Sequence, residues 1–212
     1  MSPRPYRLGR RQATVDATRA RILRAARAVL LARGSTEFAI DAVARRARVT
    51  RATVYQRFGS RRRLLEALFD RLAAEGGMGD LAGAFRQPDP DAALERFVAT
   101  FGRFWTAARP LHRRLRGLAA LDAGLDRTLQ ARQEWRRQGL RVLVERWRAR
   151  HASPAPAALG ETVDALFGLT SFETFDALAG PPPRTPADAA PLVLLLARAV
   201  LTASRQAQAW LR

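Results

Sequence analysis

Apolar residues recur three and four positions apart along most of the chain, which is the period of an amphipathic α-helix. The first such pattern predicts a helix from about Asp16 to Arg33, with Ile22, Leu23, Ala26, Val29 and Leu30 on its apolar face. Gly34 follows, where a left-handed residue suits a helix end. A later helix is expected to begin after Ser60 as N-cap, with Leu64, Leu65, Leu68, Phe69 and Leu72 facing inward.

The stretch Ala39–Phe58 between these helices predicts two shorter ones joined by a tight turn. The first has Ile40, Val43, Ala44 and Ala47 on one face. Thr50 is placed to cap the second helix, in which Val54 and Phe58 point inward. Arg51, Ala52, Tyr55 and Gln56 then remain on the outside or at the exposed start of that helix. A short helix with these side chains fits the major groove of DNA, so the pattern predicts a helix-turn-helix.

The rest of the chain is also predicted to be helical, and no segment alternates like a strand ladder. Four glycines and two prolines make residues 76–90 an expected junction between domains. Helices are expected from about Asp91 to the break at Pro110, from Leu111 to Leu121, over Leu125–Arg150, over Leu159–Ala179 and from Ala187 or Leu192 to Leu211. We therefore predict an all-α protein with a flexible basic arm (1–15), a helix-turn-helix DNA-binding domain (16–75) and a helical body (76–212).

Aromatic residues of the body fall at helical spacing and are interpreted as core by default, Trp135 among them. Some are candidates to line a cavity, because apolar pockets between bundle helices are common ligand sites. His112 is interpreted as a polar surface or boundary group, since a lone histidine has no partner set. The candidate ligand-binding residues are Phe101, Trp105, His112, Leu115, Phe172 and Phe175.

The charge of the chain favours a polyanionic partner. All 37 basic residues are arginines, and the net charge is +18. Residues 1–75 hold 18 arginines against six acidic residues, a balance of +12, whereas residues 76–212 have a balance of +6. The excess is thus concentrated around the predicted helix-turn-helix. Arg61, Arg62 and Arg63 lie in a first helical turn, where cations oppose the helix dipole, so an external phosphate is a reasonable explanation for them.

Enzymes, metalloproteins and membrane proteins fit the composition poorly. There is no cysteine, only two histidines, no phosphate-cradling glycine loop and no carboxylate pair with catalytic spacing. Asp122 and Asp126 are better interpreted as charges at a helix start. No secretion signal is evident, and the longest apolar run, Pro191–Leu196, is too short to span a membrane. We expect a cytoplasmic protein without a cofactor.

Residues 16–74 resemble the DNA-binding domain of the tetracycline-repressor (TetR) family. The resemblance lies in RILRAARAVLLARG, then IDAVARRARV, then TRATVYQRFGSRRRLLEAL. It implies a three-helix DNA-binding head and a C-terminal domain that dimerises through its two last helices and binds a hydrophobic small molecule. It also implies a homodimeric, ligand-responsive repressor of a palindromic operator. A non-specific architectural DNA-binding protein is the alternative, favoured by the charge alone.

The same resemblance implies roles for individual residues. Arg51 and Ala52 would approach base edges, and Tyr55 either a base or a phosphate. The remaining residues would contact the DNA backbone: Thr50, Thr53, Gln56, Arg57 and Arg61. The chain departs from the family pattern at two positions: Ala39 replaces a capping threonine, and Arg48 replaces the glycine of the turn. Each departure is expected to cost about 1 kcal/mol of stability.

Overall fold

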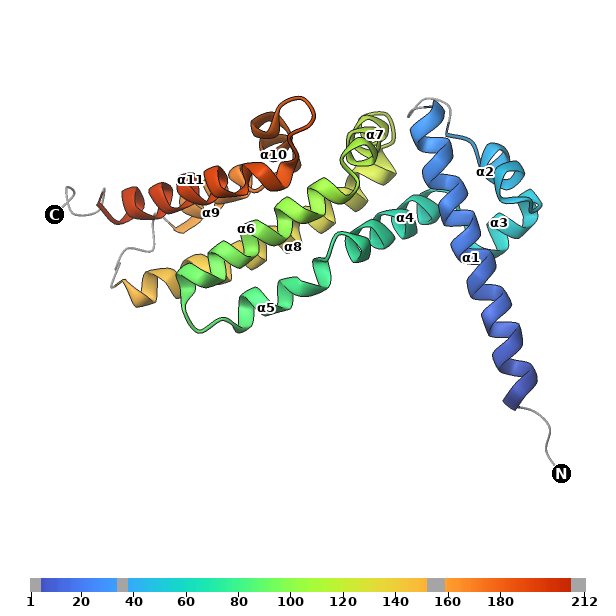
Figure 1. Cartoon of the computed structure of the whole chain (residues 1–212), viewed down its shortest axis with the longest axis horizontal. Coiled ribbons are helices and arrows are strands. Elements are labelled where there is room, and N and C mark those ends of the chain that lie inside the picture. Colours follow the sequence, from blue (N-terminus) through green and yellow to red (C-terminus); the bar gives the residue numbers. More distant parts are fainter. Residues whose placement is uncertain (1–4, 34–37, 152–158, 207–212) are drawn as a thin grey trace. The chain divides into compact units, whose positions relative to one another are not determined.

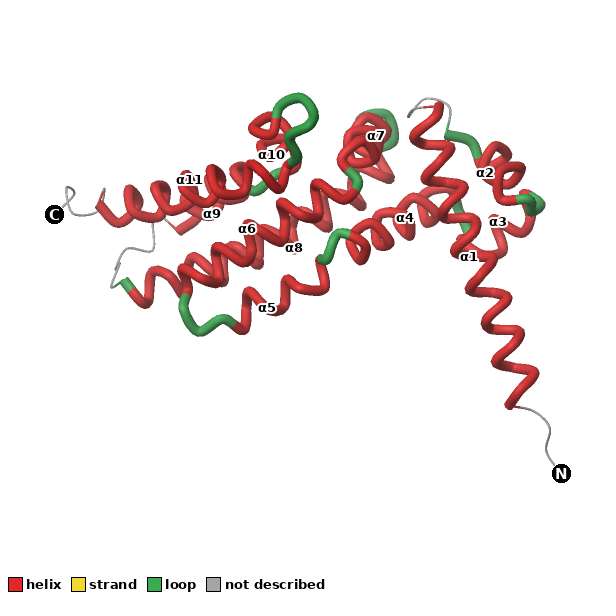
Figure 2. Tube along the Cα trace, viewed as in Figure 1, coloured by secondary structure: helices red, strands yellow, loops and turns green. Residues whose placement is uncertain are grey.

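The computed structural model describes residues 5–33, 38–151 and 159–206. These ranges form eleven α-helices and one 3-10 helix, and within them there is no strand (Figure 1, Figure 2). The predicted all-α fold is confirmed. The elements are α1 (Pro5–Arg33), α2 (Ile40–Ala47), α3 (Arg51–Phe58), α4 (Arg61–Glu75), η1 (Met78–Asp80), α5 (Leu81–Arg86), α6 (Pro90–Ala107), α7 (Arg109–Ala119), α8 (Ala123–Arg150), α9 (Leu159–Leu169), α10 (Phe172–Ala179) and α11 (Pro186–Gln206).

The chain divides into two compact units. The N-terminal unit comprises residues 1–71 and 113–126, and the C-terminal unit comprises residues 72–112 and 127–212. The sequence-based division near residue 75 assigned residues 113–126 to the body, whereas the structure groups them with the N-terminal unit. A physical reason is visible in the ion pair that joins Asp122 to Arg61 within this unit.

The N-terminal unit is built on α1. Apolar residues of this helix pack against α2, which in turn contacts α3. Ile22, Leu30, Val43, Val54 and Leu64 are each at most 1% exposed and form the centre of its core. Neither α2 nor α3 is long enough to be stable alone. The burial of apolar surface, which contributes about 25 cal/mol per Å², holds these short helices together.

The C-terminal unit has α6 at its centre. This helix packs against α5, α10 and α11, and α11 also packs against α9 and α10. The core includes the fully buried Phe97 and Phe175 together with Leu140 of α8. Arg109 fixes the loop between α10 and α11: its guanidinium pairs with Asp176 and donates to the carbonyls of Gly180 (2.7 Å) and Arg184 (3.0 Å).

Two predicted helices have different bounds in the structure, and the expected junction between domains is partly helical. The first helix begins at Pro5 rather than Asp16, because proline is well tolerated in a first helical turn. The expected junction contains α5, in which Gly83 and Ala84 are buried. The helix predicted over Leu159–Ala179 is two helices, because the Ser171 hydroxyl accepts from the Thr174 amide (3.1 Å) and caps a new start. The end predicted at Leu211 lies outside the described residues.

The placement of Trp135 in the core was also wrong, since the side chain is 82% exposed. The buried face of α8 passes through Leu129, Arg136, Leu140 and Leu143, at spacings of seven, four and three. Trp135 precedes this row by one residue and is therefore turned about 100° away from it. The helical period, taken strictly, places Arg136 inside and Trp135 outside.

One helix among the described residues, Pro186–Ser204 of α11, is long and apolar enough to cross a membrane by length and composition. The uninterrupted apolar run Pro191–Leu196 is too short to predict such a segment. In the structure Val193, Ala197 and Leu201 of this helix, four residues apart, are buried on one face. A helix that packs within a bundle meets the same criterion.

Candidate nucleic-acid interface

A short exposed helix, α3, is held at both ends by specific contacts. At its start Thr50 has an extended backbone, and its Oγ1 accepts from the Thr53 amide at 3.1 Å, which confirms the predicted N-cap. At its end Gly59, with φ of +75°, donates to the Tyr55 carbonyl at 2.6 Å. From α1, Arg19 donates to the Arg57 carbonyl (3.4 Å). The helix is therefore presented in one orientation.

The faces of α3 divide as the sequence predicts. Val54 and Phe58 are buried at 1% and 5% exposure. The outward-facing residues of its first two turns are all exposed: Arg51, Ala52, Tyr55 and Gln56. A guanidinium, a phenol and an amide thus lie on one solvent-facing side of a helix about 12 Å long. Such groups donate and accept hydrogen bonds to base edges in a major groove.

Arg51 is tethered to the helix before it. Its Nη1 lies 3.2 Å from Oδ2 of Asp41 in α2, and its Nη2 donates to the Tyr55 hydroxyl at 3.4 Å. The Tyr55 hydrogen bond and the Asp41 charge raise the pKa of Arg51 above its ordinary value. Asp41 was not among the predicted functional residues. Asp41 lies in the first turn of α2, where the helix dipole favours acidic residues. Its position therefore does not distinguish a functional residue from an ordinary helix-start charge.

Three other candidate DNA-contact residues, Thr50, Thr53 and Arg57, have intramolecular contacts or are partly buried. The hydroxyls of Thr50 and Thr53 are 2.8 Å apart, so one donates to the other. Arg57 is only partly exposed, and its Nε is buried without a hydrogen-bond partner. A phosphate contact by any of these three residues remains a prediction.

Arg61 has two intramolecular partners. Its Nη1 donates to Asp122 Oδ2 at 2.7 Å, and its Nε donates to the Phe38 carbonyl at 3.2 Å. Asp122 also accepts from the backbone amides of Gly124 and Leu125, both at 3.0 Å, and so caps α8 as predicted. The Leu125 amide first and Arg61 next lower the pKa of Asp122. The guanidinium thus has a structural role in addition to the predicted phosphate contact.

The two departures from the family pattern lie at the start of α2 and in the turn between α2 and α3. Ala39 takes the extended N-cap conformation of α2 but has no side-chain hydrogen bond to offer. Arg48 has a φ of +52° and is left-handed, as expected for a position that usually holds glycine. The next amide, that of Val49, donates to the Ala44 carbonyl at 3.0 Å. The turn therefore keeps its hydrogen bonds despite the strained arginine.

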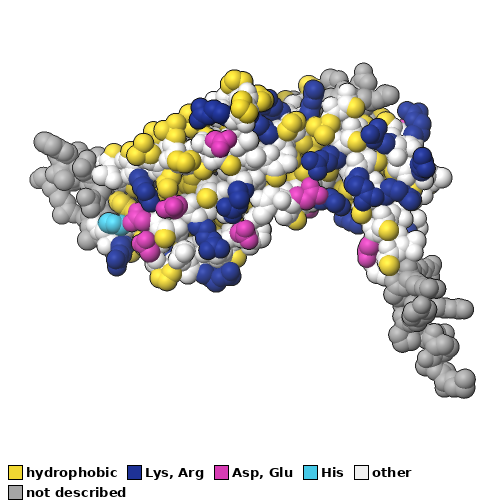
Figure 3. Space-filling model, viewed as in Figure 1, with side chains coloured by type: hydrophobic (Ala, Val, Ile, Leu, Met, Phe, Trp, Pro, Cys, Tyr) yellow, Lys and Arg dark blue, Asp and Glu magenta, His cyan; other side chains and the backbone are white. Residues whose placement is uncertain are grey.

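The surface around these helices is rich in arginine. On the face drawn in Figure 3, dark-blue side chains are spread over the part of the chain that holds α1–α4, with few acidic ones between them. Arg45, Arg46, Arg48, Arg62 and Arg63 are all exposed. Lysine and arginine neutralise phosphates and release counterions, which is the main sequence-independent term in DNA binding.

A second candidate site lies in the C-terminal unit, where aromatic rings from three helices meet. The indole of Trp105 is 5.9 Å from the ring of Phe101, 5.0 Å from His112 and 5.5 Å from Phe172, measured between centroids. These four residues form the aromatic cluster. Four of the six predicted ligand-binding residues are thereby brought together.

The other two predicted residues lie differently. Phe175 is fully buried, and a Cβ added to Gly102 of α6 would meet its ring. Leu115 is buried but belongs to the N-terminal unit. The interpretation of His112 as a surface or boundary group was wrong: its side chain is 3% exposed, because α7 turns it inward against Phe104 and Trp105.

Arg136 is a polar neighbour of the aromatic cluster that sequence reasoning missed. Its guanidinium lies 4.0 Å from the ring of Phe167 and 5.8 Å from that of Phe101. Its Nη1 donates to the Phe167 carbonyl and to the Thr170 hydroxyl, both at 2.7 Å. An arginine on the apolar face of α8 was the available signal. A cation held over aromatic rings is worth about 2 kcal/mol when desolvated.

Residues 22–68 match the model of the tetR family of bacterial regulatory proteins. The structure resembles a TetR-like transcriptional regulator from Rhodococcus sp. RHA1, with 22% identity, a TM-score of 0.63 and coverage of 86% of this chain and 96% of that one. It also resembles NalD of Pseudomonas aeruginosa, the secondary repressor of the MexAB-OprM multidrug efflux pump, with 22% identity, a TM-score of 0.59 and coverage of 88% and 96%. A third similar structure is Salmonella enterica GusR, with 20% identity, a TM-score of 0.62 and coverage of 90% of this chain and 96% of that one. No curated protein matches the chain.

Proposed function

We propose that this chain, which belongs to the tetR family of bacterial regulatory proteins, is a transcriptional regulator that recognises duplex DNA through α3. The observation that carries the proposal is the construction of this helix. It is capped by Thr50, anchored by Val54 and Phe58, and exposes Arg51 and Tyr55 from a surface rich in arginine. A rigid short helix with an exposed polar face is what insertion into a major groove requires.

In this proposal some residues in and around α3 contact bases and others contact the DNA backbone. Arg51 and Tyr55 address base edges, and Ala52 allows close approach of the helix. Arginine pairs well with guanine because two of its N–H groups match the O6 and N7 acceptors. Backbone contacts are assigned to Thr50, Thr53, Gln56, Arg57 and Arg61. These contacts set the register of the head and carry no sequence information.

The proposed operator is palindromic because the active form is proposed to be a homodimer. Three leucines of α11 are exposed in the single chain, namely Leu192 (42%), Leu195 (64%) and Leu196 (37%). Large apolar surfaces of this kind are usually covered by a partner. A twofold dimer through the C-terminal helices would place two copies of α3 in successive major grooves, about 34–36 Å apart or somewhat more.

We further propose that a hydrophobic small molecule regulates DNA binding from the aromatic cluster. Aromatic side chains of α6, α7 and α10 make the surroundings of this cluster apolar, and Arg136 adds a buried cation beside it. Ligand would release DNA by favouring a state whose heads no longer fit the operator, which requires different affinities for the two states. The repressor named among the similar structures supports repression as the direction of control.

Selection of bound duplexes from a random-sequence pool tests the proposal. The full chain should enrich an inverted repeat, and an Arg51→Ala variant should enrich none. A matched variant, Arg150→Ala, removes one exposed arginine from the end of α8 and should enrich the wild-type site. Failure of the wild-type chain to enrich any sequence, with a steep salt dependence, would instead establish the non-specific architectural alternative.

A further inference from the structure

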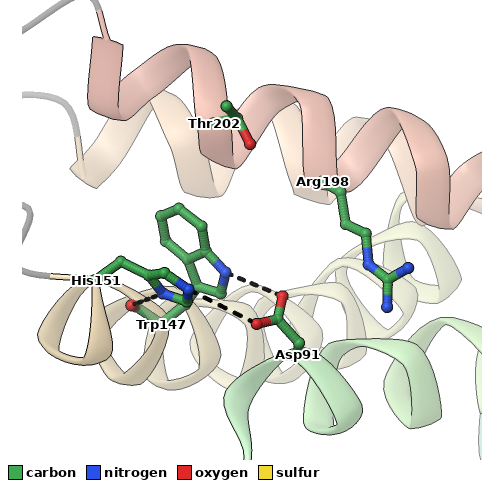
Figure 4. Close-up of a pocket in the computed structure, with 5 residues that line it drawn as sticks. All are labelled: Asp91, Trp147, His151, Arg198 and Thr202. Atoms are coloured by element: carbon green, nitrogen blue, oxygen red, sulfur yellow. Dashed lines mark hydrogen bonds and ion pairs between the residues drawn. The ribbon is translucent and has the colours of Figure 1, made fainter.

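A small polar cavity lies in the C-terminal unit, away from the aromatic cluster. Its volume is about 280 Å³. Among the described residues it is lined by Asp91 of α6, Trp147 of α8, His151 directly after α8, and Arg198 and Thr202 of α11 (Figure 4). Asp91 precedes Trp105 by fourteen residues on α6, about 21 Å along the helix. A volume just below the usual range for ligand pockets suits a small metabolite.

One wall of the cavity offers hydrogen-bond acceptors. Nδ1 of His151 lies 2.9 Å from the Trp147 carbonyl, which can only accept, so Nδ1 carries the proton. In the neutral ring Nε2 is then an acceptor, and it faces Oδ2 of Asp91 across 3.8 Å. This distance exceeds a direct hydrogen bond. A hydroxyl or ammonium group of a ligand could donate to both atoms, so the wall is complementary to a donor.

The wall formed by Asp91 and His151 is also rigid. Oδ1 of Asp91 accepts from the indole Nε1 of Trp147 at 3.2 Å. The rings of Trp147 and His151 are stacked, with centroids 4.2 Å apart and an interplanar angle of 22°. Trp147 is 7% exposed, which fixes the stack against the core. Asp91 and His151 are therefore positioned before any ligand binds, which lowers the entropy cost of binding.

The opposite wall offers donors. Arg198 and Thr202 lie four residues apart on α11 and so share one face of the helix. Figure 4 shows both side chains pointing from α11 toward α6 and α8. Nη2 of Arg198 donates to Glu95 Oε2 at 3.3 Å, and a guanidinium has four further N–H groups. A guanidinium and a hydroxyl on one helix face are complementary to a carboxylate.

We propose that this cavity binds a small carboxylic acid that carries a second, donating group, that is, an α-amino or α-hydroxy acid. The carboxylate binds Arg198 and Thr202, and the ammonium or hydroxyl group binds between Asp91 and His151. Glu95 competes with the ligand for the guanidinium. The proposal requires no DNA binding by α3, so it stands or falls separately from the proposed function.

Isothermal titration calorimetry of the full chain with four probes tests the site. L-Serine and glycerate carry both groups, acetate carries only the carboxylate and ethanolamine only the donors. The two-group probes are expected to bind saturably, one per chain, with an affinity at least tenfold above either single-group probe. The Asp91→Asn variant distinguishes binding of an ammonium group from binding of a hydroxyl group. It should weaken the binding of serine more than that of glycerate.

Substitutions at two exposed residues test the role of the guanidinium. Arg198→Ala should weaken both two-group probes at least tenfold, and Glu95→Gln should strengthen them severalfold by releasing the guanidinium. Arg150→Ala is the matched control and should change neither. Circular dichroism checks that each variant is folded. The proposal is overturned if neither two-group probe binds in the millimolar range, or if both bind equally well after Arg198→Ala and Asp91→Asn in folded protein.

Discussion

Asp41 and Arg51 form an ion pair between α2 and α3, with Nη1 3.2 Å from Oδ2, and the same guanidinium donates to the Tyr55 hydroxyl. Both side chains of the pair are more than half exposed, so the bond adds little to stability. Its consequence is the direction of the guanidinium. An arginine held from one side keeps its remaining N–H groups aimed outward, where base acceptors lie in the proposed complex.

Replacing Asp41 by asparagine tests this positioning role. Asp41→Asn removes a negative charge near DNA and frees Arg51 to contact any phosphate. We expect tighter binding to random duplex and a loss of roughly tenfold in the preference for the selected operator, since a good arginine–guanine pair discriminates by about 1–3 kcal/mol. Fluorescence anisotropy at one fixed salt concentration measures both affinities. An unchanged preference would leave Asp41 with no part in recognition.

Arg48 offers a prediction about stability. Its backbone is left-handed, with a φ of +52°, which glycine adopts at no steric cost. Arg48→Gly should raise the free energy of unfolding by about 1 kcal/mol, measured by denaturant titration of the full chain. Arg46→Gly is the control, because Arg46 is exposed within regular α2 and glycine there should destabilise by about 1 kcal/mol. Equal effects of the two changes would contradict the account.

The missing cap of α2 gives a related expectation. Ala39 already has the extended conformation of an N-cap, with φ −113° and ψ 141°. A serine there can accept from an amide of the first turn, so Ala39→Ser should stabilise the chain by about 1 kcal/mol. The increase in melting temperature should be absent in Ala39→Val, which has no oxygen to offer. If valine stabilises as much as serine, the gain is not capping.

Asp122 should make stability depend on acid pH. The Leu125 amide and Arg61 lower its pKa below the ordinary value of 3.8, so the ionised carboxylate stabilises the fold. This contribution is complete above the ordinary value and is lost as the pH falls through the lowered pKa. Asp122→Asn keeps an oxygen for the cap but loses the charge.

We therefore expect Asp122→Asn to be less stable than wild type at neutral pH, with the difference shrinking in acid, and Asp122→Ala to be less stable still by about 1 kcal/mol. Denaturant titrations from neutral pH to below pH 4 measure both differences. A gap between wild type and Asp122→Asn that stays constant over this range would show that the carboxylate charge does not stabilise the fold.

The α3 helix was predictable because each of its features is local. Thr50 caps residues within one turn, and the burial of Val54 and Phe58 follows from a four-residue spacing. The left-handed Arg48 was predictable for the same reason, since the family pattern has glycine at the turn. Helix periodicity likewise gave α6 and α8 nearly to their observed starts.

Contacts between residues far apart in sequence were not predictable. Arg61 pairs with Asp122, sixty-one residues later, and nothing in either local pattern names the other. The burial of His112 depends on its contacts with Phe104 and Phe172, which spacing alone does not fix. Trp135 was misplaced because hydrophobicity was given more weight than the helical period.

The central claim is that α3 reads a DNA sequence through Arg51 and Tyr55. The most direct measurement is the ratio of dissociation constants for the selected operator and a scrambled duplex, at one salt concentration, in wild type, Arg51→Ala, Tyr55→Ala and the control Arg150→Ala. We predict that the preference for operator falls about tenfold or more in the first two variants and is unchanged in the control. A preference that survives both substitutions in folded, dimeric protein would contradict the claim.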